Sequence, residues 1–204
     1  MYVLGLDTTG GYCSAAIVDE AVVIARESQP MSRGHAEHLA PMVARLLRAA
    51  HITAKDLGKI AVCTGPGSFT GVRVALAFAK GLTLPHGIPV IGVSALQVWA
   101  ASLDAENGKD ILSCADVRRN EIFWQVWKNG KPQAAPVLSD VSGAPKANAI
   151  VGTGAHLLGG TEQDSYVSPE MIAWLGAEQT PETASANPLY HRPPDAKLPG
   201  GKTL

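Results

Sequence analysis

A carboxylate and two hydroxyls follow the first apolar run of the chain, as Asp7, Thr8 and Thr9, and two glycines come next. Backbone N–H groups of such a loop can bind phosphate oxygens, and an aspartate can bind a hydrated metal ion. The same residue types are more typical of a β-turn in which Asp7 and Thr8 hydrogen-bond to the local backbone. The three residues are therefore only candidates for cofactor binding, and no cofactor is predicted.

A glycine-rich segment from Gly65 to Gly71, with the sequence GPGSFTG, is the second place where chemistry could occur. Its glycines allow close backbone approach, and the N–H groups and positive dipole end of a following helix would attract an anion. The segment lacks the lysine of a Walker loop, which argues against a P-loop NTPase. Arg73 could supply charge. The alternative is a tight corner between a strand and a helix, with Ser68 or Thr70 as the helix cap.

His35 and His38 flank Glu37 at a spacing of three residues, which could place both rings on one side of a helix. The HExxH spacing of zinc enzymes is not met, and no G-x-S-x-G elbow surrounds Ser68. The three cysteines lie far apart without a CxxC pair, which argues against a zinc ribbon and a disulfide framework. The sequence therefore predicts no catalytic residue and no metal site.

A cluster of aromatic residues lies near basic ones in the second half of the chain. Phe123, Trp124 and Trp127 fit a strand that fills a core better than a platform for stacking bases. Arg118, Arg119 and Lys128 add local charge. The whole chain has 17 basic and 18 acidic residues, for a net charge of -1, so it has no overall field to attract nucleic acid.

Strand and helix patterns alternate along the chain, which predicts an α/β protein. Strands are expected over residues 2–6, 14–18, 22–26, 59–64, 88–93, 111–115, 121–127 and 149–151, and helices over 34–51, 68–84, 94–103 and 169–175. Ser32 is the expected cap of the first helix. Two lobes are predicted, an N-terminal lobe over residues 1–100 and a smaller C-terminal lobe over 101–204 that ends in a Pro-rich tail from Pro181 onward.

Two of these helices carry apolar or small residues on more than one face. The row of apolar residues on each helix, here called its stripe, could pack against the helix's own sheet, or it could bind a partner protein. Both interpretations stay open from the residues alone. The stripes consist of Leu39, Met42, Val43 and Leu46 in the first helix and Val72, Ala75, Leu76 and Ala79 in the second.

The overall composition indicates a folded, water-soluble chain. Of 204 residues, 46% are hydrophobic and 17% are charged, which excludes a disordered chain. There is no secretory leader and no apolar run of the roughly 20 residues needed to span a membrane. We therefore expect a cytoplasmic protein that is not exported and does not bind a membrane.

Several ordered motifs give the sequence a close resemblance, over nearly its whole length, to the bacterial TsaB (YeaZ) family. The GPGSFTG segment is the most specific of them. The others are residues 4–9 (LGLDTT), 35–41 (HAEHLAP), 80–82 (KGL), 88–96 (IPVIGVSAL), 116–123 (DVRRNEIF) and 188–196 (PLYHRPPDA).

This resemblance implies a two-lobed fold of the actin, sugar-kinase and Hsp70 type (ASKHA) with a reduced second lobe. It also implies a non-catalytic partner of the subunit TsaD, which forms threonylcarbamoyladenosine at position 37 of tRNAs that read codons beginning with A. TsaD holds its metal with an HxxxH pair, which is absent from this sequence. Residues 116–119 stand where a second phosphate loop would be expected, which makes an autonomous ATPase doubtful.

The resemblance further implies that the two striped helices form a four-helix contact with TsaD, or with a second copy of the chain when TsaD is absent. The ATPase TsaE and tRNA would be reached only through that complex. His35, His38, Phe69 and Arg73 join the two stripes in the expected interface. The rival hypothesis is an enzyme that acts alone, either an ATP-dependent phosphotransferase or a glycoprotease-like peptidase.

Overall fold

The computed structural model describes residues 1–103, 109–160 and 166–190. Its first sheet has five strands in the order β3-β2-β1-β4-β5. β1 pairs antiparallel with β2 and parallel with β4, and β5 extends the parallel half. The strands are β1 (Tyr2–Asp7), β2 (Tyr12–Asp19), β3 (Val22–Pro30), β4 (Leu57–Cys63) and β5 (Val90–Val93).

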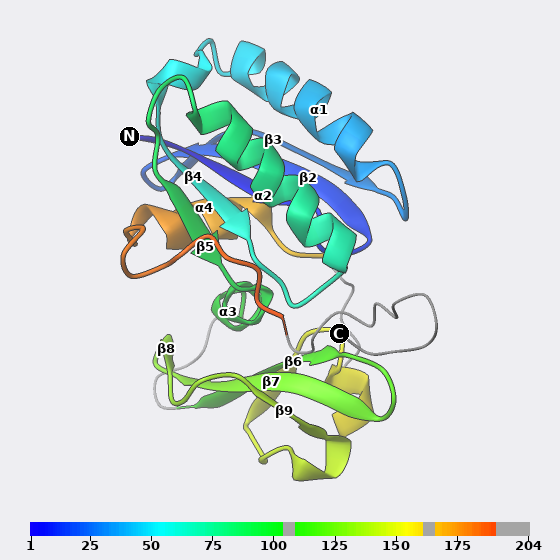
Figure 1. Cartoon of the computed structure of the whole chain (residues 1–204). Helices are drawn as coiled ribbons and strands as arrows, with labels where there is room; N and C mark the ends of the chain where they lie inside the picture. Colours follow the sequence, from blue (N-terminus) through cyan, green and yellow to red (C-terminus); the bar gives the residue numbers. More distant parts are fainter. Residues whose placement is uncertain (104–108, 161–165, 191–204) are drawn as a thin grey trace.

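Helices cover both faces of this sheet, which explains why β1 and β2 are apolar almost throughout rather than alternating. α1 (His35–Ala49) and α2 (Phe69–Thr83) lie on one face, over Leu4 and Leu6. α4 (Pro169–Ala177) lies on the other face, over Val3. Figure 1 shows the resulting layers, with α4 brought back to the first lobe from late in the chain.

The second sheet also has five strands, and four of them repeat the plan of four strands of the first. β6 pairs antiparallel with β7 and parallel with β10, and β7 pairs antiparallel with β9, so β9-β7-β6-β10 matches β3-β2-β1-β4. The two-lobed α/β fold with a reduced second lobe is therefore confirmed. The strands are β6 (Asp110–Asp116), β7 (Glu121–Lys128), β8 (Lys131–Pro132), β9 (Val137–Asp140) and β10 (Ala149–Val151), and α3 (Ala95–Ala101) packs on β6.

Three short 3₁₀ turns complete the described elements: η1 (Ala54–Asp56), η2 (Val141–Gly143) and η3 (Ala155–Leu158). The sequence did not predict β8, β9 or η2, because residues 129–149 lack sustained periodicity. No helix within the described parts of the chain is both long and apolar enough to cross a lipid bilayer.

The two predicted helix caps have different outcomes. Ser68 caps α2 as predicted, since its Oγ accepts a hydrogen bond from the Gly71 N–H at 3.2 Å. The prediction that Ser32 caps α1 is wrong. Gly34 is the cap residue, and its φ of 86° lies in the left-handed region that glycine adopts without strain.

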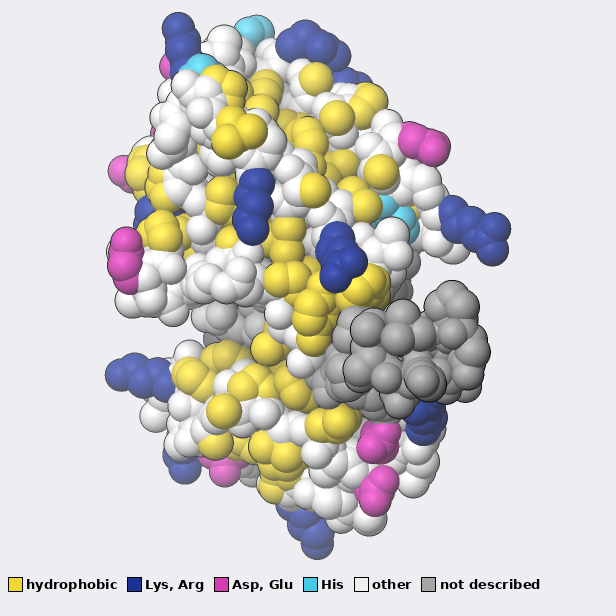
Figure 2. Space-filling model, in the orientation of Figure 1, with side chains coloured by type: hydrophobic (Ala, Val, Ile, Leu, Met, Phe, Trp, Pro, Cys, Tyr) yellow, Lys and Arg dark blue, Asp and Glu magenta, His cyan; other side chains and the backbone are white. Residues whose placement is uncertain are grey.

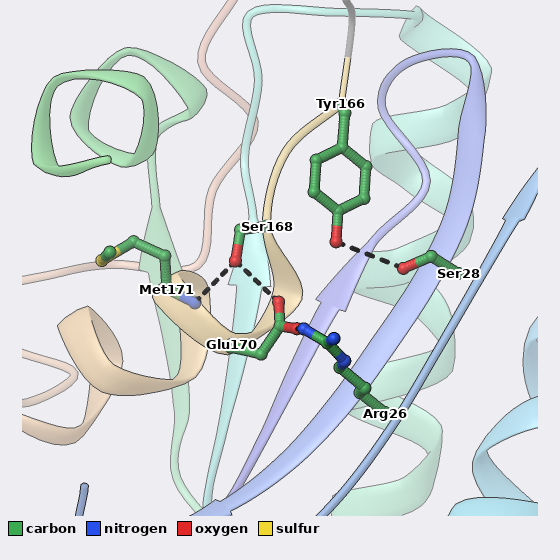
Figure 3. A network of polar contacts seen from close by, with 6 residues as sticks. All are labelled: Arg26, Ser28, Tyr166, Ser168, Glu170 and Met171. Carbon is green, nitrogen blue, oxygen red and sulfur yellow. Dashed lines mark hydrogen bonds and ion pairs between the residues drawn. The ribbon is translucent and has the colours of Figure 1, made fainter. Parts of the chain in front are cut away.

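α4 is held at both ends by side chains of the first sheet. At its start, Arg26 Nη1 donates to Glu170 Oε1 at 2.7 Å, and the Ser168 hydroxyl donates to the other carboxylate oxygen (Figure 3). Burial works to raise the pKa of Glu170, but these two hydrogen bonds outweigh it and the pKa lies below its usual value. At the helix end, Lys59 Nζ donates to the carbonyls of Ala177 and Gln179 at 2.5 and 2.6 Å.

The segment after α4 lies along β5, the edge strand of the first sheet. The Gly92 N–H donates to the Ala184 carbonyl, and Ile91 and Ser185 form an antiparallel bridge. The Leu189 N–H then donates to the Thr64 carbonyl. The predicted tail therefore begins as an ordered segment on the sheet, and its residues 191–204 lie outside the described residues.

Candidate functional site

An apolar groove runs between α1 and α2 on the outer side of the first lobe. It encloses about 490 Å³. Figure 2 shows hydrophobic side chains gathered over this part of the surface, where α1 and α2 lie in Figure 1. The groove is lined by Ala36, Leu39, Phe69, Thr70, Arg73, Val74, Ala77 and Phe78.

The structure divides the predicted interface residues into two groups. The stripe residues pack in the core against their own sheet, and of them only Leu39 also lines the groove. This buried group is Leu39, Met42, Val43, Leu46, Val72, Leu76 and Ala79. Phe69, Arg73 and His38 are exposed and His35 is half-buried, so only these four offer surface to a partner.

The outward positions of α2 that line the groove were not singled out from the sequence. Val74 and Phe78 are half-buried and Ala77 is exposed. They lie one position beyond or before the buried stripe, at a helical spacing of three and four residues. Reading both faces of the helix at this spacing would have found them.

A three-residue stack closes one end of the groove. The Arg73 guanidinium carbon lies 3.8 Å from the centroid of the Phe69 ring, and Arg73 Nε donates to the Tyr190 hydroxyl at 3.0 Å. The rings of Phe69 and Tyr190 stack with centroids 5.3 Å apart. Tyr190 comes from the C-terminal segment and was not predicted as a site residue.

The Asp7–Thr9 segment holds the start of α2. The Thr8 hydroxyl donates to the Gly71 carbonyl at 2.6 Å, and the Ser68 N–H donates to the Thr9 carbonyl at 2.7 Å. A Cβ atom built on Gly71 would lie only 2.0 Å from the Thr8 carbonyl oxygen. The glycine therefore permits contact between two backbone segments, the end of β1 and the first turn of α2.

Asp7 is buried beside this contact. Its Oδ1 accepts hydrogen bonds from the Thr9 N–H and hydroxyl at 3.0 and 2.7 Å, while its Oδ2 has no partner among the described residues. Burial raises the pKa of the Asp7 carboxyl from 3.8 to about 6, against the lowering effect of the Thr9 hydrogen bonds. The neighbouring Cys63 thiol lies 3.6 Å from the Thr9 hydroxyl, and burial raises its pKa as well.

A cleft of about 590 Å³ separates the two lobes, and both turns that could form phosphate loops reach it. Thr9 and Gly10 line one side, and Asp116 and Arg118 line the other. In the second turn the Arg118 N–H donates to the carboxylate of Asp116 itself, at 2.7 Å. The Thr8 and Thr9 hydroxyls of the first turn already donate hydrogen bonds within the protein. The second turn carries the carboxylate of Asp116, which would repel a phosphate, so these residues do not fit a phosphate clamp.

His35 and His38 lie in the first turn of α1. His38 Nδ1 lies 2.9 Å from the Gly34 carbonyl, and His35 Nε2 is buried and has no hydrogen-bond partner among the described residues. Within residues 1–103, 109–160 and 166–190, no three His, Cys, Asp or Glu side chains are grouped so that they could hold a metal ion.

The aromatic residues of β7 belong to the second lobe's own packing, as predicted. Phe123 and Trp127 are buried, and Trp127 Nε1 donates to the Ser113 hydroxyl at 2.8 Å. Trp124 is half-buried and donates to Ser139. These rings are therefore not available as a stacking platform for bases.

Two lobes with the same strand plan, and a cleft lined by the first hairpin turn of each, define a protein of the actin, sugar-kinase and Hsp70 class. The family model described as "TsaD: tRNA N6-adenosine threonylcarbamoyltransferase" matches residues 27–144. YeaZ from Pseudomonas aeruginosa is similar in structure, with a TM-score of 0.76 and 25% identity over 93% of this chain and 99% of that one. The chain belongs to the TsaB (YeaZ) family.

Curated relatives support the same assignment. The tRNA threonylcarbamoyladenosine biosynthesis protein TsaB of Escherichia coli is 35% identical over 61% of this chain, and that of Bacillus subtilis is 34% identical over 64%. These matches span 54% and 57% of the two relatives, little more than half of each. An uncharacterized protein of Mycobacterium tuberculosis is 34% identical over 96% of this chain and 93% of its own length.

Proposed function

We propose that this chain is a non-catalytic scaffold and activating subunit for the formation of threonylcarbamoyladenosine at position 37 of tRNAs that read codons beginning with A. It acts by dimerising with the catalytic subunit TsaD. The observation that carries this proposal is the apolar groove between α1 and α2 in a member of the TsaB family. An open apolar groove between two helices is a suitable seat for helices of another subunit.

The family match suggests how the two subunits meet. The TsaD model matches residues 27–144, a range that includes both α1 and α2. A partner of that family would bring equivalent helices, and packing the two pairs together gives a four-helix contact about a pseudo-twofold axis. The same geometry allows two copies of this chain to pair when TsaD is absent.

Several features support a subunit without chemistry of its own. The sequence has no HxxxH pair, and the turns at the cleft do not fit a phosphate clamp. The net charge of -1 and the buried aromatic residues of β7 favour tRNA contact through the complex rather than directly. We also propose that the ATPase TsaE acts through that complex, in the cytoplasm and away from membranes.

The exposed residue Ala77 allows a direct test of the groove. Ala77→Asp places a charge on the groove floor without disturbing the core, so it should abolish co-elution with TsaD in size-exclusion chromatography. Ala135→Asp, at an exposed position of the second lobe, is the matched control and should leave co-elution intact. Unchanged co-elution of the Ala77→Asp variant would contradict the proposed contact.

The rival function is an enzyme that acts alone, as an ATP-dependent phosphotransferase or a glycoprotease-like peptidase. Its support is the buried Asp7 beside the glycine-rich segment. The purified chain should neither hydrolyse ATP nor cleave protein above background. Turnover that disappears in the Asp7→Ala variant would establish the rival function instead.

A further inference from the structure

The C-terminal segment brings one side chain, that of Tyr190, to the groove region from outside α1 and α2. Residues 184–189 are fixed along the sheet end by the hydrogen bonds of Ala184 and Leu189 and by the Ser185 bridge. Tyr190, the last described residue, therefore starts from an anchored backbone. Its ring reaches the first turn of α2.

The stack on α2 leaves large aromatic surfaces open. Phe69 is 41% exposed and Tyr190 is 42% exposed, although their rings stack on one another. They are the two exposed aromatic rings among the exposed large hydrophobic residues of the described chain. Aromatic rings and arginine are the side chains most enriched where binding energy concentrates in protein interfaces.

Arg73 is oriented by this stack. Its Nε is bound to the Tyr190 hydroxyl and its guanidinium lies over the Phe69 ring, so the terminal nitrogens are the part left to meet an acceptor. Arg73 makes no ion pair within the described parts of the chain. Holding the guanidinium before binding reduces the entropy lost on forming a contact.

The stack is continuous with the groove, because Phe69 and Arg73 belong to both. We propose that Tyr190 is a partner-contact residue, and that residues 184–190 are the third segment of the TsaD-binding face, beside α1 and α2. The partner packs an apolar side chain on the Phe69 and Tyr190 rings and presents a carboxylate to Arg73. This inference rests on the proposed function and adds a segment beyond the residues that match the TsaD model.

Isothermal titration calorimetry with the purified TsaD subunit from the same organism tests this. Tyr190→Ala removes the ring, and we expect the Kd to rise by about 30-fold or more. Tyr190→Phe keeps the ring and frees Arg73 Nε, and we expect a rise of about fivefold. Tyr166→Phe is the matched control, because its hydroxyl bonds Ser28 on the α4 side of the sheet (Figure 3), and the Kd should stay within about twofold.

A double-variant cycle separates this role from general stability. If Tyr190 acts by orienting Arg73, Tyr190→Phe should have no further effect on the Kd once Arg73 is replaced by Ala. Thermal melting of each variant checks the fold, and Tyr190→Phe remains informative if Tyr190→Ala melts early. A Kd within about twofold of wild type for both Tyr190 variants overturns the inference and leaves the proposed function standing. Failure of the wild-type chain to bind TsaD overturns both.

Discussion

Asp7, a residue type typical of phosphate loops, is buried and hydrogen-bonded within its own segment. One carboxylate oxygen receives two hydrogen bonds from Thr9, and the other is buried without a partner in the described structure. The segment it belongs to supports the first turn of α2 through Thr8. A buried carboxyl with one unpaired oxygen among the described residues therefore lies in the segment that supports the candidate partner-binding helix.

The raised pKa of Asp7 gives a pH-dependent stability. A folded-state pKa of about 6 against 3.8 means that this contribution is fully present below pH 3.8 and is lost as the pH rises through 6. Asp7→Asn keeps an oxygen for the Thr9 donors and never ionises. Its free energy of unfolding should therefore exceed that of wild type increasingly with pH, by about 1.4 kcal/mol more at pH 8 than at pH 5.

Urea unfolding of both proteins at pH 5 and pH 8 measures this difference. An advantage of Asp7→Asn that is the same at both pH values would show that the carboxyl titrates alike in the folded and unfolded chains. If Asp7→Asn were less stable than wild type at pH 8, the buried charge of Asp7 would be favourable. That result would contradict the expectation from Oδ2, which has no partner among the described residues.

At the scale of single residues, local rules had mixed success. Ser68 could be predicted as a cap because its hydroxyl serves a donor three residues ahead. Ser32 looked equally suitable, but the chain turns at Gly34 with a positive φ, so the helix begins later. Tyr190 could not be found, because its partners Phe69 and Arg73 lie more than a hundred residues earlier in the chain.

At the scale of elements, the strongest prediction concerns the contact that positions α2 against β1. Gly71→Ala would place a Cβ 2.0 Å from the Thr8 backbone oxygen, so α2 must shift away from β1. We expect a loss of about 2 kcal/mol or more in unfolding free energy together with weaker TsaD binding, measured by urea unfolding and calorimetry.

Gly81→Ala, in the same helix, is the matched control. A Cβ there meets no atom within 4 Å, so this variant should be more stable by roughly 0.5 to 1 kcal/mol and bind TsaD normally. Equal effects of the two substitutions would show that contact with Thr8 does not position α2.

The end of α4 depends on a lysine from β4. Lys59 Nζ donates to the carbonyl of Ala177, the last residue of the helix, and to that of Gln179 just beyond it, and carbonyls at a helix end have no partner within the helix. Lys59→Met keeps the aliphatic stem but removes these hydrogen bonds, so urea unfolding should show a loss of about 1 to 3 kcal/mol. Lys131→Met, at an exposed position of β8, should change stability by less than about 0.5 kcal/mol. A loss of the same size in both variants would contradict a capping role for Lys59.

Helix periodicity predicted α1 and α2 but left open which of their faces covers the sheet and which could meet a partner. The stripe from Leu39 to Leu46 is buried against the sheet, as is the stripe from Val72 to Ala79. An apolar stripe on a helix indicates that this face is covered, but it does not show whether the helix's own sheet or another protein covers it. The spacing of Ala77 and Phe78 could have placed them on a second face of α2, but that this face borders a groove with α1 depends on how the two helices pack.

At the scale of the whole molecule, the alternation of strands and helices was enough to predict an α/β fold, and the family motifs implied the two lobes. Sequence patterns did not indicate that α4 returns from residue 169 to cover the first sheet, because its contacts with Arg26 and Lys59 join distant parts of the chain. The division at residue 100 stays a prediction about the sequence, while α4 and residues 184–190 pack with the first lobe.

For the whole assembly, we propose that this chain is required for tRNA modification without doing the chemistry itself. The most direct test is to reconstitute the modification from purified subunits, once with this chain and once without it. The product, threonylcarbamoyladenosine, is measured by mass spectrometry. Omission should reduce the product to background. Wild type and Asp7→Asn should restore it, whereas Ala77→Asp should not. Full product without this chain, or product formed by this chain without TsaD, would contradict the account.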